Sequence, residues 1–457
     1  MNSVRVSRIL HAGYLLESNG TQILFDPVLT NPFSHNCWAF PSASIDQNKV
    51  PQLDLQAVFI SHSHDDHFCL ESLNLLKRST PIFGYSPESE FFALLEEMGF
   101  ESVVPLRVDA AIEVGPFVVT PRLALDPDID TLFQIEVAGL QILNVVDAWI
   151  DPEALKLLQK YSPWDLVLWP FQTLLELEVL SPRRQSVSTE SPTQIPSEWL
   201  EQLAGLKPRL IVPSSCQFQH EPWSWYNQAL FPISYAGFEA QLQECLPHST
   251  VLRLNPGCAF TLSREAWEIS AHLDWVLPEG PQNGDYRFDP LLEPPPMREV
   301  AQRFAALTEI DAELVQQFLS CGILARYEQL QQSPCDFWSV PRIWRLSVFD
   351  HQGQPTHFDY ALVRSQMVPH YLSSGEEIAW CTEIAATKIH SALLKGESLT
   401  SLYLRINAQP SIPTVEKERQ DADLLQDPLV RCLYEGRFAA FQKAQLRRLQ
   451  GHSRTKS

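Results

Sequence analysis

The 457-residue chain is poor in positive charge and lacks long apolar runs. It has 34 lysine and arginine residues against 55 aspartate and glutamate residues, a formal net charge of −21 at pH 7. A nucleic-acid binder without sequence preference needs a cationic surface to neutralise phosphates, so this balance argues against that class. No stretch approaches the ~20 apolar residues of a membrane helix, and no signal-peptide pattern opens the chain. We therefore expect a cytoplasmic protein with no nucleic-acid or membrane partner.

The nine cysteines form none of the spaced pairs that hold metals or clusters. CxxC is absent, and so is the CxH…CxxH pairing of a Rieske iron–sulfur centre. Scattered thiols in odd number fit a reducing compartment, where most act as small buried hydrophobic residues. The patterns GxGxxG, GxSxG and the P-loop are absent too, which removes three common catalytic and nucleotide-binding classes.

The composition is that of a folded protein with a large core. Hydrophobic residues make up 45% of the chain and charged residues 19%, so global disorder is excluded. The length is about three times a typical ~150-residue domain, which favours two domains, one of them large. Proline, at 35 residues, outnumbers glycine, at 17, and this indicates rigid rather than flexible loops.

The first part of the chain alternates strand and helix patterns. A hairpin is predicted from residues 4–10 and 14–25, with a tight turn at Ser18-Asn19-Gly20. Further strand patterns cover residues 57–60, 81–84, 132–137, 140–146, 164–169 and 209–212, and helical spacing covers residues 69–77 and 88–98. This alternation predicts a layered α/β domain over residues 1–280, ending near a proline and glycine cluster. Residues 180–198 are rich in serine and proline, which is typical of a surface loop.

A second domain, α+β in class, is predicted over residues 286–457. Its centre reads as a hairpin of residues 344–349 and 358–363 around the turn at residues 350–353, and residues 399–406 read as a strand. Residues 377–394 have helical spacing. Nothing in this part has the spacing of metal ligands, so we expect a domain that shapes the substrate site or mediates homo-oligomerisation.

Four residues with metal-binding chemistry follow one apolar strand. His62, His64, Asp66 and His67 fall within six positions directly after residues 57–60. Residues i and i+2 leaving a strand point the same way, so His62 and His64 can converge on one ion, while Asp66 and His67 can turn toward a second. Imidazole and carboxylate together suit zinc, iron or manganese. Three histidines in six positions are improbable by chance in a chain with 13.

This HxHxDH run resembles the signature of the metallo-β-lactamase superfamily. The segments His11-Ala12-Gly13-Tyr14-Leu15-Leu16 and Ile23-Leu24-Phe25-Asp26-Pro27 look like the first hairpin of that fold, and Asn144-Val145-Val146-Asp147 looks like its bridging-aspartate motif. The sequences of these segments are most similar to those of the subgroup that includes the ascorbate-6-phosphate lactonase and the CMP-N-acetylneuraminate hydroxylase. The resemblance implies a four-layer αββα fold over roughly the first 275 residues.

The resemblance also implies a role for each matching residue. His62 and His64 would hold one metal ion, Asp66 and His67 a second, and Asp147 would bridge the two. Asp66 would also orient the attacking water as a catalytic residue. Asp26 would be structural, supporting the loops that carry the ligands, and His11 would be a hydrogen-bonded structural histidine near the site. The loop with His35 and Trp38 would either cap the substrate or simply pack.

The sequence departs from the family pattern at two ligand positions. The family supplies a further histidine between the HxHxDH run and the bridging aspartate, but none lies between His67 and Asp147. Three aspartates at the expected place offer oxygen ligands instead: Asp126, Asp128 and Asp130. The last family histidine follows a late strand, where this chain has Pro213-Ser214-Ser215. His220 is the nearest histidine and is a candidate metal ligand.

Three functions follow from this ligand set. The leading prediction is a metal-dependent hydrolase with one or two zinc ions, in which a metal-bound hydroxide attacks an ester, lactone, amide or phosphoester of a small molecule. Such a metal lowers the pKa of its bound water to ~7. The loss of histidines in favour of oxygen ligands tilts the site toward iron or manganese, so a non-haem di-iron oxygenase is the alternative. A non-catalytic metal-binding protein with a degenerate site is the third.

Overall fold

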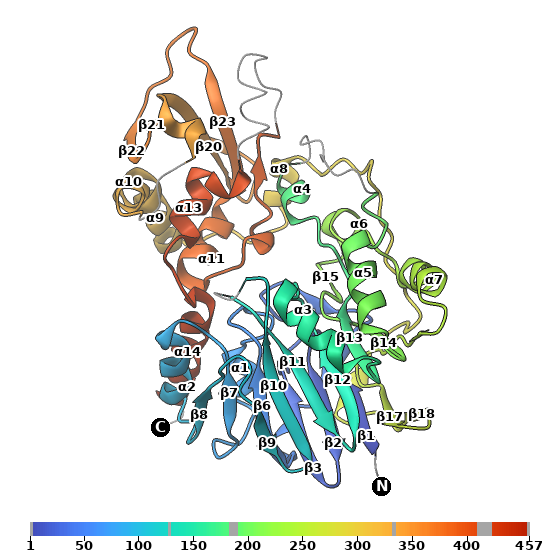
Figure 1. Ribbon diagram of the computed structural model, residues 1–457. Helices are drawn as coiled ribbons and strands as arrows, with labels where there is room; N and C mark the ends of the chain where they lie inside the picture. The colour runs from blue at the N-terminus through green and yellow to red at the C-terminus, as the bar shows by residue number, and fades with distance from the viewer. Residues whose placement is uncertain (1–2, 127–128, 182–190, 331–334, 409–422, 455–457) are drawn as a thin grey trace. The chain divides into compact units, whose positions relative to one another are not determined.

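The computed structural model describes residues 3–126, 129–181, 191–330, 335–408 and 423–454 (Figure 1). The chain forms two compact units. The first contains Met1–Leu174, Ser188–Asp289 and Gln445–Ser457, and the second contains Leu175–Val187 and Pro290–Ala444. The predicted division into residues 1–280 and 286–457 assumed two continuous segments, whereas each of these units is built from more than one.

Two large sheets make up the first unit. One sheet has eight strands in the order β18 (Trp267–Ser270), β17 (Ala259–Ser263), β1 (Ser3–Arg8), β2 (Tyr14–Ser18), β3 (Thr21–Phe25), β6 (Leu55–Ile60), β7 (Ile82–Gly84), β8 (Val103–Pro105). The other has seven in the order β16 (Thr250–Val251), β14 (Leu210–Ser214), β13 (Leu166–Pro170), β12 (Leu140–Asn144), β11 (Thr131–Val137), β10 (Phe117–Leu123), β9 (Ile112–Val114). The strand patterns read from the sequence fall on these elements, with shifts of at most two residues at the ends.

The two sheets pack face to face around one hydrophobic core. Phe25 of β3 and Phe59 of β6 stack with ring centroids 5.1 Å apart, and Phe133 of β11, from the other sheet, lies 5.1 Å from Phe25. All three side chains are buried, in a cluster that draws alternate residues from both sheets. Alternation along each strand is what sends one set of side chains inward and the next set outward.

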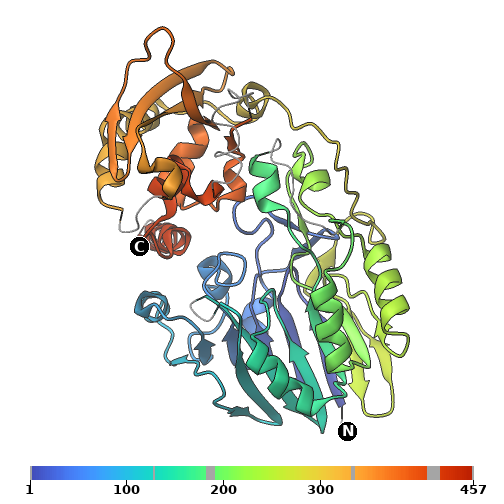
Figure 2. The same cartoon turned by 45° about the horizontal axis from the view of Figure 1, so that its top comes forward.

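Helices cover the outer faces of the sheets in Figures 1 and 2. They are α1 (Leu70–Leu73), α2 (Ser89–Glu97), α3 (Pro152–Leu158), α5 (Ser197–Leu206) and α7 (Tyr235–Cys245). On one side, an added Cβ at Gly84 of β7 would lie 2.4 Å from the ring of Phe91 in α2, so only glycine allows this helix to approach. On the other side, Trp199 of α5 packs edge-to-face on Trp169 of β13. The layered α/β fold predicted from the sequence is confirmed.

The direction of the strands explains where the chemistry gathers. Strands β3 and β6 are parallel neighbours, and so are β12, β13 and β14. The carboxyl ends of parallel strands meet at one edge of a sheet, which is where α/β folds place their sites. Asp26 follows β3, His62 follows β6 and Asp147 follows β12, so one edge of the sandwich collects them.

The second unit is built on a five-stranded sheet. Its order is β22 (Gln366–Pro369), β21 (Pro355–Val363), β20 (Arg342–Phe349), β23 (Ile378–Ala385), β24 (Arg405–Ile406). Its helices are α4 (Glu176–Leu180), α8 (Met297–Ala301), α9 (Glu309–Gln317), α10 (Ile323–Glu328), α11 (Ala386–Lys395) and α13 (Pro428–Tyr434), with short 3-10 and π turns between them. The predicted hairpin is present as β20 and β21. The last helix, α14 (Ala440–Arg454), begins in this unit and continues into the first.

Two predictions for this unit are wrong. Residues 377–394, predicted as a helix, begin with strand β23, which pairs in parallel with β20 and places Trp380 opposite Trp344. Only the later residues form α11. Residues 399–406, predicted as a strand, contain a 3-10 turn, Thr400–Leu402, before the two-residue strand β24. Of the predicted surface loop at 180–198, residues 182–190 lie outside the described residues.

Two general expectations can be compared with the structure. All nine cysteines lie within the described ranges, and no disulfide joins any two of them. Among the helices that are described, none has both the length and the apolar character that crossing a membrane requires.

Candidate metal centre

Histidine and aspartate side chains from five segments converge at the carboxyl edge of the sheets. The segments are the connection after β1, the end of β3, the loop after β6, the turn before β11 and the end of β12. Their side chains form three groups whose ligand atoms all lie within 4.8 Å of one another: His62, His64 and Asp130; His62, His67 and Asp147; and His11, Asp66 and His67. Because the groups share His62 and His67, they make one continuous cluster.

The distances within the cluster are those of ligands around a shared space. Nε2 of His62 lies 2.9 Å from Nδ1 of His64 and 3.9 Å from Oδ1 of Asp147. Nε2 of His67 lies 3.1 Å from Oδ2 of Asp147 and 3.7 Å from Oδ2 of Asp66. Asp147 thus faces both His62 and His67, which is the arrangement of a bridging ligand.

Proton positions on the two buried histidines follow from their other contacts. The Asp26 carboxylate only accepts hydrogen bonds, so Nδ1 of His67, 3.2 Å away, carries a proton. The Ser61 hydroxyl donates its one proton to Asp26 at 2.8 Å, and it therefore accepts from Nδ1 of His62 at 2.9 Å. Both histidines consequently direct Nε2 into the cluster, as metal ligation through that nitrogen requires.

The donor set fits a divalent cation. Oδ1 of Asp147 and Oδ1 of Asp130 are buried and have no hydrogen-bond partner among the described residues. Oδ1 of Asp147 lies 3.9 Å from Nε2 of His62, and Oδ1 of Asp130 lies 3.7 Å from Nδ1 of the same ring. Unsatisfied carboxylate oxygens packed against imidazole nitrogens are costly without a positive charge between them. A bound metal ion supplies that charge.

Without metal, protons supply part of the charge. Burial lowers the pKa of His67, but the carboxylates of Asp147 and Asp66 outweigh burial and hold it well above its usual value. Burial raises the pKa of Asp147 and Asp66, and the positive His67 reverses this and lowers both. Burial, reinforced by the His67 charge, keeps the pKa of His62 well below normal. The metal-free cluster therefore holds a charged His67 beside a neutral His62.

Two other carboxyl groups at the cluster are driven toward the neutral form. Burial and the nearby Asp147 carboxylate raise the pKa of Asp130 to about 6. Burial and the neighbouring Asp66 raise the pKa of Asp65 to about 7. Excess negative charge is thus concentrated here in the absence of an ion, and a cation would relieve it.

Comparison with known protein families identifies the domain that carries this cluster. Residues 10–143 match the sequence profile of the Metallo-beta-lactamase superfamily. This chain carries a metallo-β-lactamase domain. The matched range contains β2, β3 and the whole HxHxDH run, and the domain's sheets and flanking helices continue beyond it on both sides.

Among curated proteins, the metallo-β-lactamase domain is similar to CMP-N-acetylneuraminic acid hydroxylases. The cytidine monophosphate-N-acetylneuraminic acid hydroxylase of Danio rerio is 29% identical over 153 residues, which cover 32% of this chain. The match spans only 26% of that relative, about a quarter of its length.

Solved structures share the fold at low similarity. A possible metal-dependent hydrolase from Veillonella parvula has a TM-score of 0.41 and 13% identity and covers 57% of this chain and 100% of its own. CmlA, a di-iron β-hydroxylase from Streptomyces venezuelae, has a TM-score of 0.39 and 16% identity and covers 57% of this chain and 53% of its own. At this level of similarity, neither carries an argument about the reaction.

The structure distinguishes among the three aspartates proposed to replace the missing family histidine. Oδ1 of Asp130 lies 3.7 Å from His62, and Asp130 belongs to the group with His62 and His64. Asp126 is exposed and belongs to none of the three groups, and Asp128 lies outside the described residues. The Thr131 hydroxyl donates to the Ser61 carbonyl at 3.0 Å, which holds the start of β11 against the ligand loop. Asp130 is placed by that contact.

His11 enters the metallo-β-lactamase domain's cluster more closely than the sequence predicted. It is fully buried, and its Nε2 lies 3.0 Å from Oδ2 of Asp66. Its Nδ1 has no hydrogen-bond partner among the described residues. The contact of its Nε2 with Asp66 fits the hydrogen-bonded position near the site that the resemblance implies. The ring packs against Phe33 and Phe218. The sequence signal was available, since His11 follows the first strand at the same edge as the motif.

His220 lies among aromatic rings instead of in the three ligand groups. Its ring centroid is 5.2 Å from Tyr226 and 5.6 Å from Phe218, and its main-chain amide donates to Asn227 at 2.7 Å. The metal role of His220 stays a prediction that this arrangement does not support directly. At the place of the last family histidine, the Ser215 hydroxyl donates to the Val146 carbonyl at 2.6 Å and so anchors the residue before Asp147.

The loop with His35 and Trp38 is pinned to the late strand. Trp38 and Ala39 form the short strand β4, which pairs with β15 (Phe218–Gln219). Asn36 of the same loop donates to Glu221 at 3.3 Å. The loop thus packs against the segment that carries His220, and its role as a substrate cap stays a prediction.

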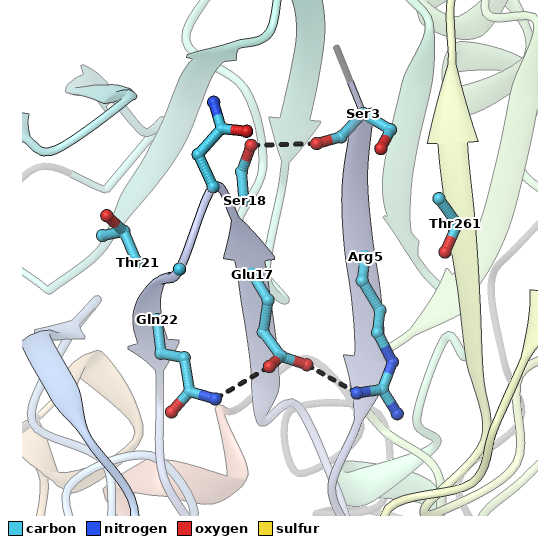
Figure 3. A pocket seen from close by; sticks show the side chains of 9 residues that line it. Ser3, Arg5, Glu17, Ser18, Thr21, Gln22 and Thr261 are labelled. Atoms are coloured by element: carbon cyan, nitrogen blue, oxygen red, sulfur yellow. Dashed lines mark hydrogen bonds and ion pairs between the residues drawn. The ribbon is translucent and has the colours of Figure 1, made fainter. Parts of the chain in front are cut away.

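A surface pocket of about 240 Å³ lies at the other end of strand β3 (Figure 3). It surrounds the turn between β2 and β3, whereas Asp26 and the ligand cluster follow the carboxyl end of β3. Within the pocket, the Glu17 carboxylate forms an ion pair with Arg5 at 2.8 Å and accepts a hydrogen bond from Gln22 at 2.7 Å. The negative charge of Glu17 is therefore neutralised by Arg5. The pocket is therefore separate from the candidate metal centre.

Proposed function

We propose that this chain is a non-haem iron oxygenase that hydroxylates a small molecule at a two-ion centre. One observation carries the proposal: the outer ligand groups each combine two histidines with one carboxylate. These groups are His62, His64 and Asp130, and His11, Asp66 and His67. Two histidines and one carboxylate with open positions are the ligand set typical of non-haem iron oxygenases.

The chain's own residues set up the centre before any substrate arrives. Asp26 and Ser61 fix the ring orientations of His67 and His62, and Asp147 faces both rings from the second sheet. The three carboxylates Asp66, Asp130 and Asp147 are 20–24% exposed, whereas His62 and His67 are buried. The carboxylates therefore form the edge of the cluster that solvent and substrate reach. Bound iron would supply the activation of dioxygen.

The overall reaction requires reducing equivalents from outside the chain. Hydroxylation by dioxygen inserts one oxygen atom into a C–H bond and releases the other as water, which consumes two electrons and two protons. The cysteine spacing of a Rieske centre is missing, so we propose an external electron-transfer protein as the donor. The names of the similar hydroxylases, which describe those proteins, are a second support for this reaction class.

Hydrolysis of an ester, lactone, amide or phosphoester, the leading prediction from sequence, is the second candidate. The position of Asp147 between His62 and His67 supports hydrolysis as well, because many hydrolases use two metal ions held close together. In this reaction Asp66 would orient the attacking water, with zinc as the ion. In either reaction we propose a small-molecule substrate and a cytoplasmic location.

Metal analysis separates the two candidates. The protein is expressed in iron-replete and in zinc-replete medium, and bound metal is counted and its optical spectrum recorded. The oxygenase proposal predicts stoichiometric iron with ligand-field or charge-transfer absorption, and oxygen consumption once the iron is reduced. A sample to which zinc is added in place of iron is the control and consumes no oxygen. Stoichiometric zinc from both media, with no iron features, would contradict the oxygenase and favour the hydrolase.

A further inference from the structure

The helix that follows the ligand loop has no cap of its own. Helix α1 begins at Leu70, three residues after His67, and its N-cap residue, Cys69, makes no side-chain capping bond. The first amides of a helix have no partner inside the helix, and a buried amide without a partner is costly. Leu70 is fully buried, so water does not solve the problem.

A side chain from the far end of the sequence supplies this cap. Oε1 of Gln445, in α14, accepts the hydrogen bond from the Leu70 amide at 2.8 Å, and Nε2 of the same amide group donates to Sγ of Cys69 at 3.2 Å. Gln445 is fully buried. The Gln445 side chain therefore makes hydrogen bonds with two consecutive residues, Cys69 and Leu70, at the start of α1. In the sequence, 375 positions separate Gln445 from Leu70.

Further contacts hold α1 on both sides. Arg448, one turn after Gln445, pairs with Glu71 of α1 at 2.9 Å. On the other side, the Ser72 hydroxyl accepts from the amide of Leu29, in the loop that follows Asp26. Gln445 belongs to the same compact unit as the ligand cluster, and Figure 1 draws α14 in red beside the blue α1 and α2.

We infer that Gln445 is a positioning residue for the metal centre. It fixes the start of α1 at Leu70. Only Phe68 and Cys69 lie between His67 and Leu70, and both are buried, so they transmit that constraint to His67. His67 is held by Asp26 on its Nδ1 side and by this backbone anchor on its chain side. The last helix thus contributes to a site whose ligands all come from the first 147 residues. The inference rests on the proposed metal centre and holds for either reaction.

Two matched substitutions on α14 test this role. Gln445→Met removes the acceptor and keeps the side chain's length, and methionine is as good a helix former as glutamine. Gln450→Met is the control, because Gln450 lies on the same helix and donates to Glu97 of α2. Gln445→Glu keeps an oxygen that accepts from the Leu70 amide. Each protein is titrated with Co²⁺, which reports affinity and ligand geometry through its ligand-field absorption, and the melting temperature of the metal-free protein is recorded.

Gln445→Met should weaken Co²⁺ binding about 10-fold and shift the absorption band, as loss of a supporting contact does in other metal sites. Gln450→Met should bind as the parent does, and Gln445→Glu should recover most of the affinity. Equal Co²⁺ affinity and spectra for the parent and Gln445→Met would overturn the inference, as would an equal loss in both methionine variants. If Gln445→Met does not fold, Gln445→Glu takes its place. A folded Gln445→Glu that binds Co²⁺ about 10-fold more weakly than Gln450→Met, although it keeps the acceptor for the Leu70 amide, overturns the inference.

The outcomes keep the two proposals apart. A parent protein that binds no Co²⁺ would refute the metal centre itself, and the positioning role with it. A parent that binds Co²⁺ while Gln445→Met is unaffected refutes only the positioning role. The expected loss in Gln445→Met, in a protein without oxygen chemistry, supports the positioning role and refutes only the oxygenase.

Discussion

Ser61 and Asp26 are joined by two hydrogen bonds, one from the Ser61 amide and one from its hydroxyl, each 2.8 Å long. Asp26 adopts a positive φ of 40°, a conformation that costs energy and is retained where the surroundings require it. Through this pair, one buried carboxylate orients His67 directly and His62 by way of the serine hydroxyl. The ligand geometry thus depends on residues that touch no metal.

Replacing Ser61 with alanine tests this relay. The substitution removes the acceptor for the proton on Nδ1 of His62, so the ring loses its fixed tautomer and orientation. We expect metal affinity to fall about 10-fold, the lower end of the range for supporting residues. Ser63→Ala, in the same loop, is the matched control. Competition with a chromophoric chelator measures both, and an unchanged affinity in Ser61→Ala would show that the relay does not orient His62.

Replacing Asp130 with histidine should change which metal the centre prefers. A nitrogen ligand in place of the carboxylate restores the family's histidine-rich set and favours zinc over iron. We expect the ratio of bound zinc to bound iron to rise by roughly several-fold, because imidazole is a softer ligand than carboxylate. Asp126→His, at the neighbouring exposed position, should leave the ratio unchanged. An equal rise in both variants, or none in Asp130→His, would remove Asp130 from the ligand set.

Metal binding should release protons at neutral pH. The pKa of His67 in the metal-free protein lies well above its usual value, so His67 is protonated at pH 7 and must lose that proton to ligate a metal. Metal affinity therefore rises with pH until His67 titrates. Calorimetry in two buffers with different ionisation heats measures the released protons. Binding heats that do not depend on the buffer would contradict the charged state of His67.

Among the carboxylates of the second unit, we expect Asp427 to be the one whose replacement lowers the unfolding free energy most. It caps α13 through the amides of Leu429 and Val430, at 2.9 and 3.1 Å, and accepts from Trp380 and Thr382. Asp427→Ala leaves these buried donors without an acceptor and should cost about 3 kcal/mol of unfolding free energy.

The control for that variant is Asp423→Ala, at a cap on an exposed position. Asp423 accepts one bond, from the Leu425 amide at 2.9 Å, so its loss should cost about 1 kcal/mol or less. Denaturant unfolding compares the two. Equal stability losses would mean that the buried network around Asp427 adds nothing to its cap.

Much of the candidate metal centre could be predicted because the information is local. An apolar strand followed by His62, His64, Asp66 and His67 fixes both the ligands and their place at a strand end. The choice among Asp126, Asp128 and Asp130 was not local, since it depends on the contact between Thr131 and Ser61 across the two sheets. Strand order alone brings those segments together.

Other features depended on pairing that no sequence window contains. Residues 378–385 have apolar spacing that a helix would also show, and they form a strand because β20 offers a parallel partner that buries Trp380 beside Phe337. Gln445 gives no sign in the sequence of its role at α1. Its importance follows only from the fold, which returns the end of the chain to the ligand loop.

The central claim is that one His and Asp cluster holds the metal, and elemental analysis of two proteins tests it most directly. The double variant His64→Ala with Asp66→Ala removes one ligand from each outer group, while leaving Asp26, Ser61 and the core in place. We predict one or two metal ions per chain in the parent and no stoichiometric metal in the double variant, with both proteins folded. A double variant that retains metal as tightly as the parent would contradict the account.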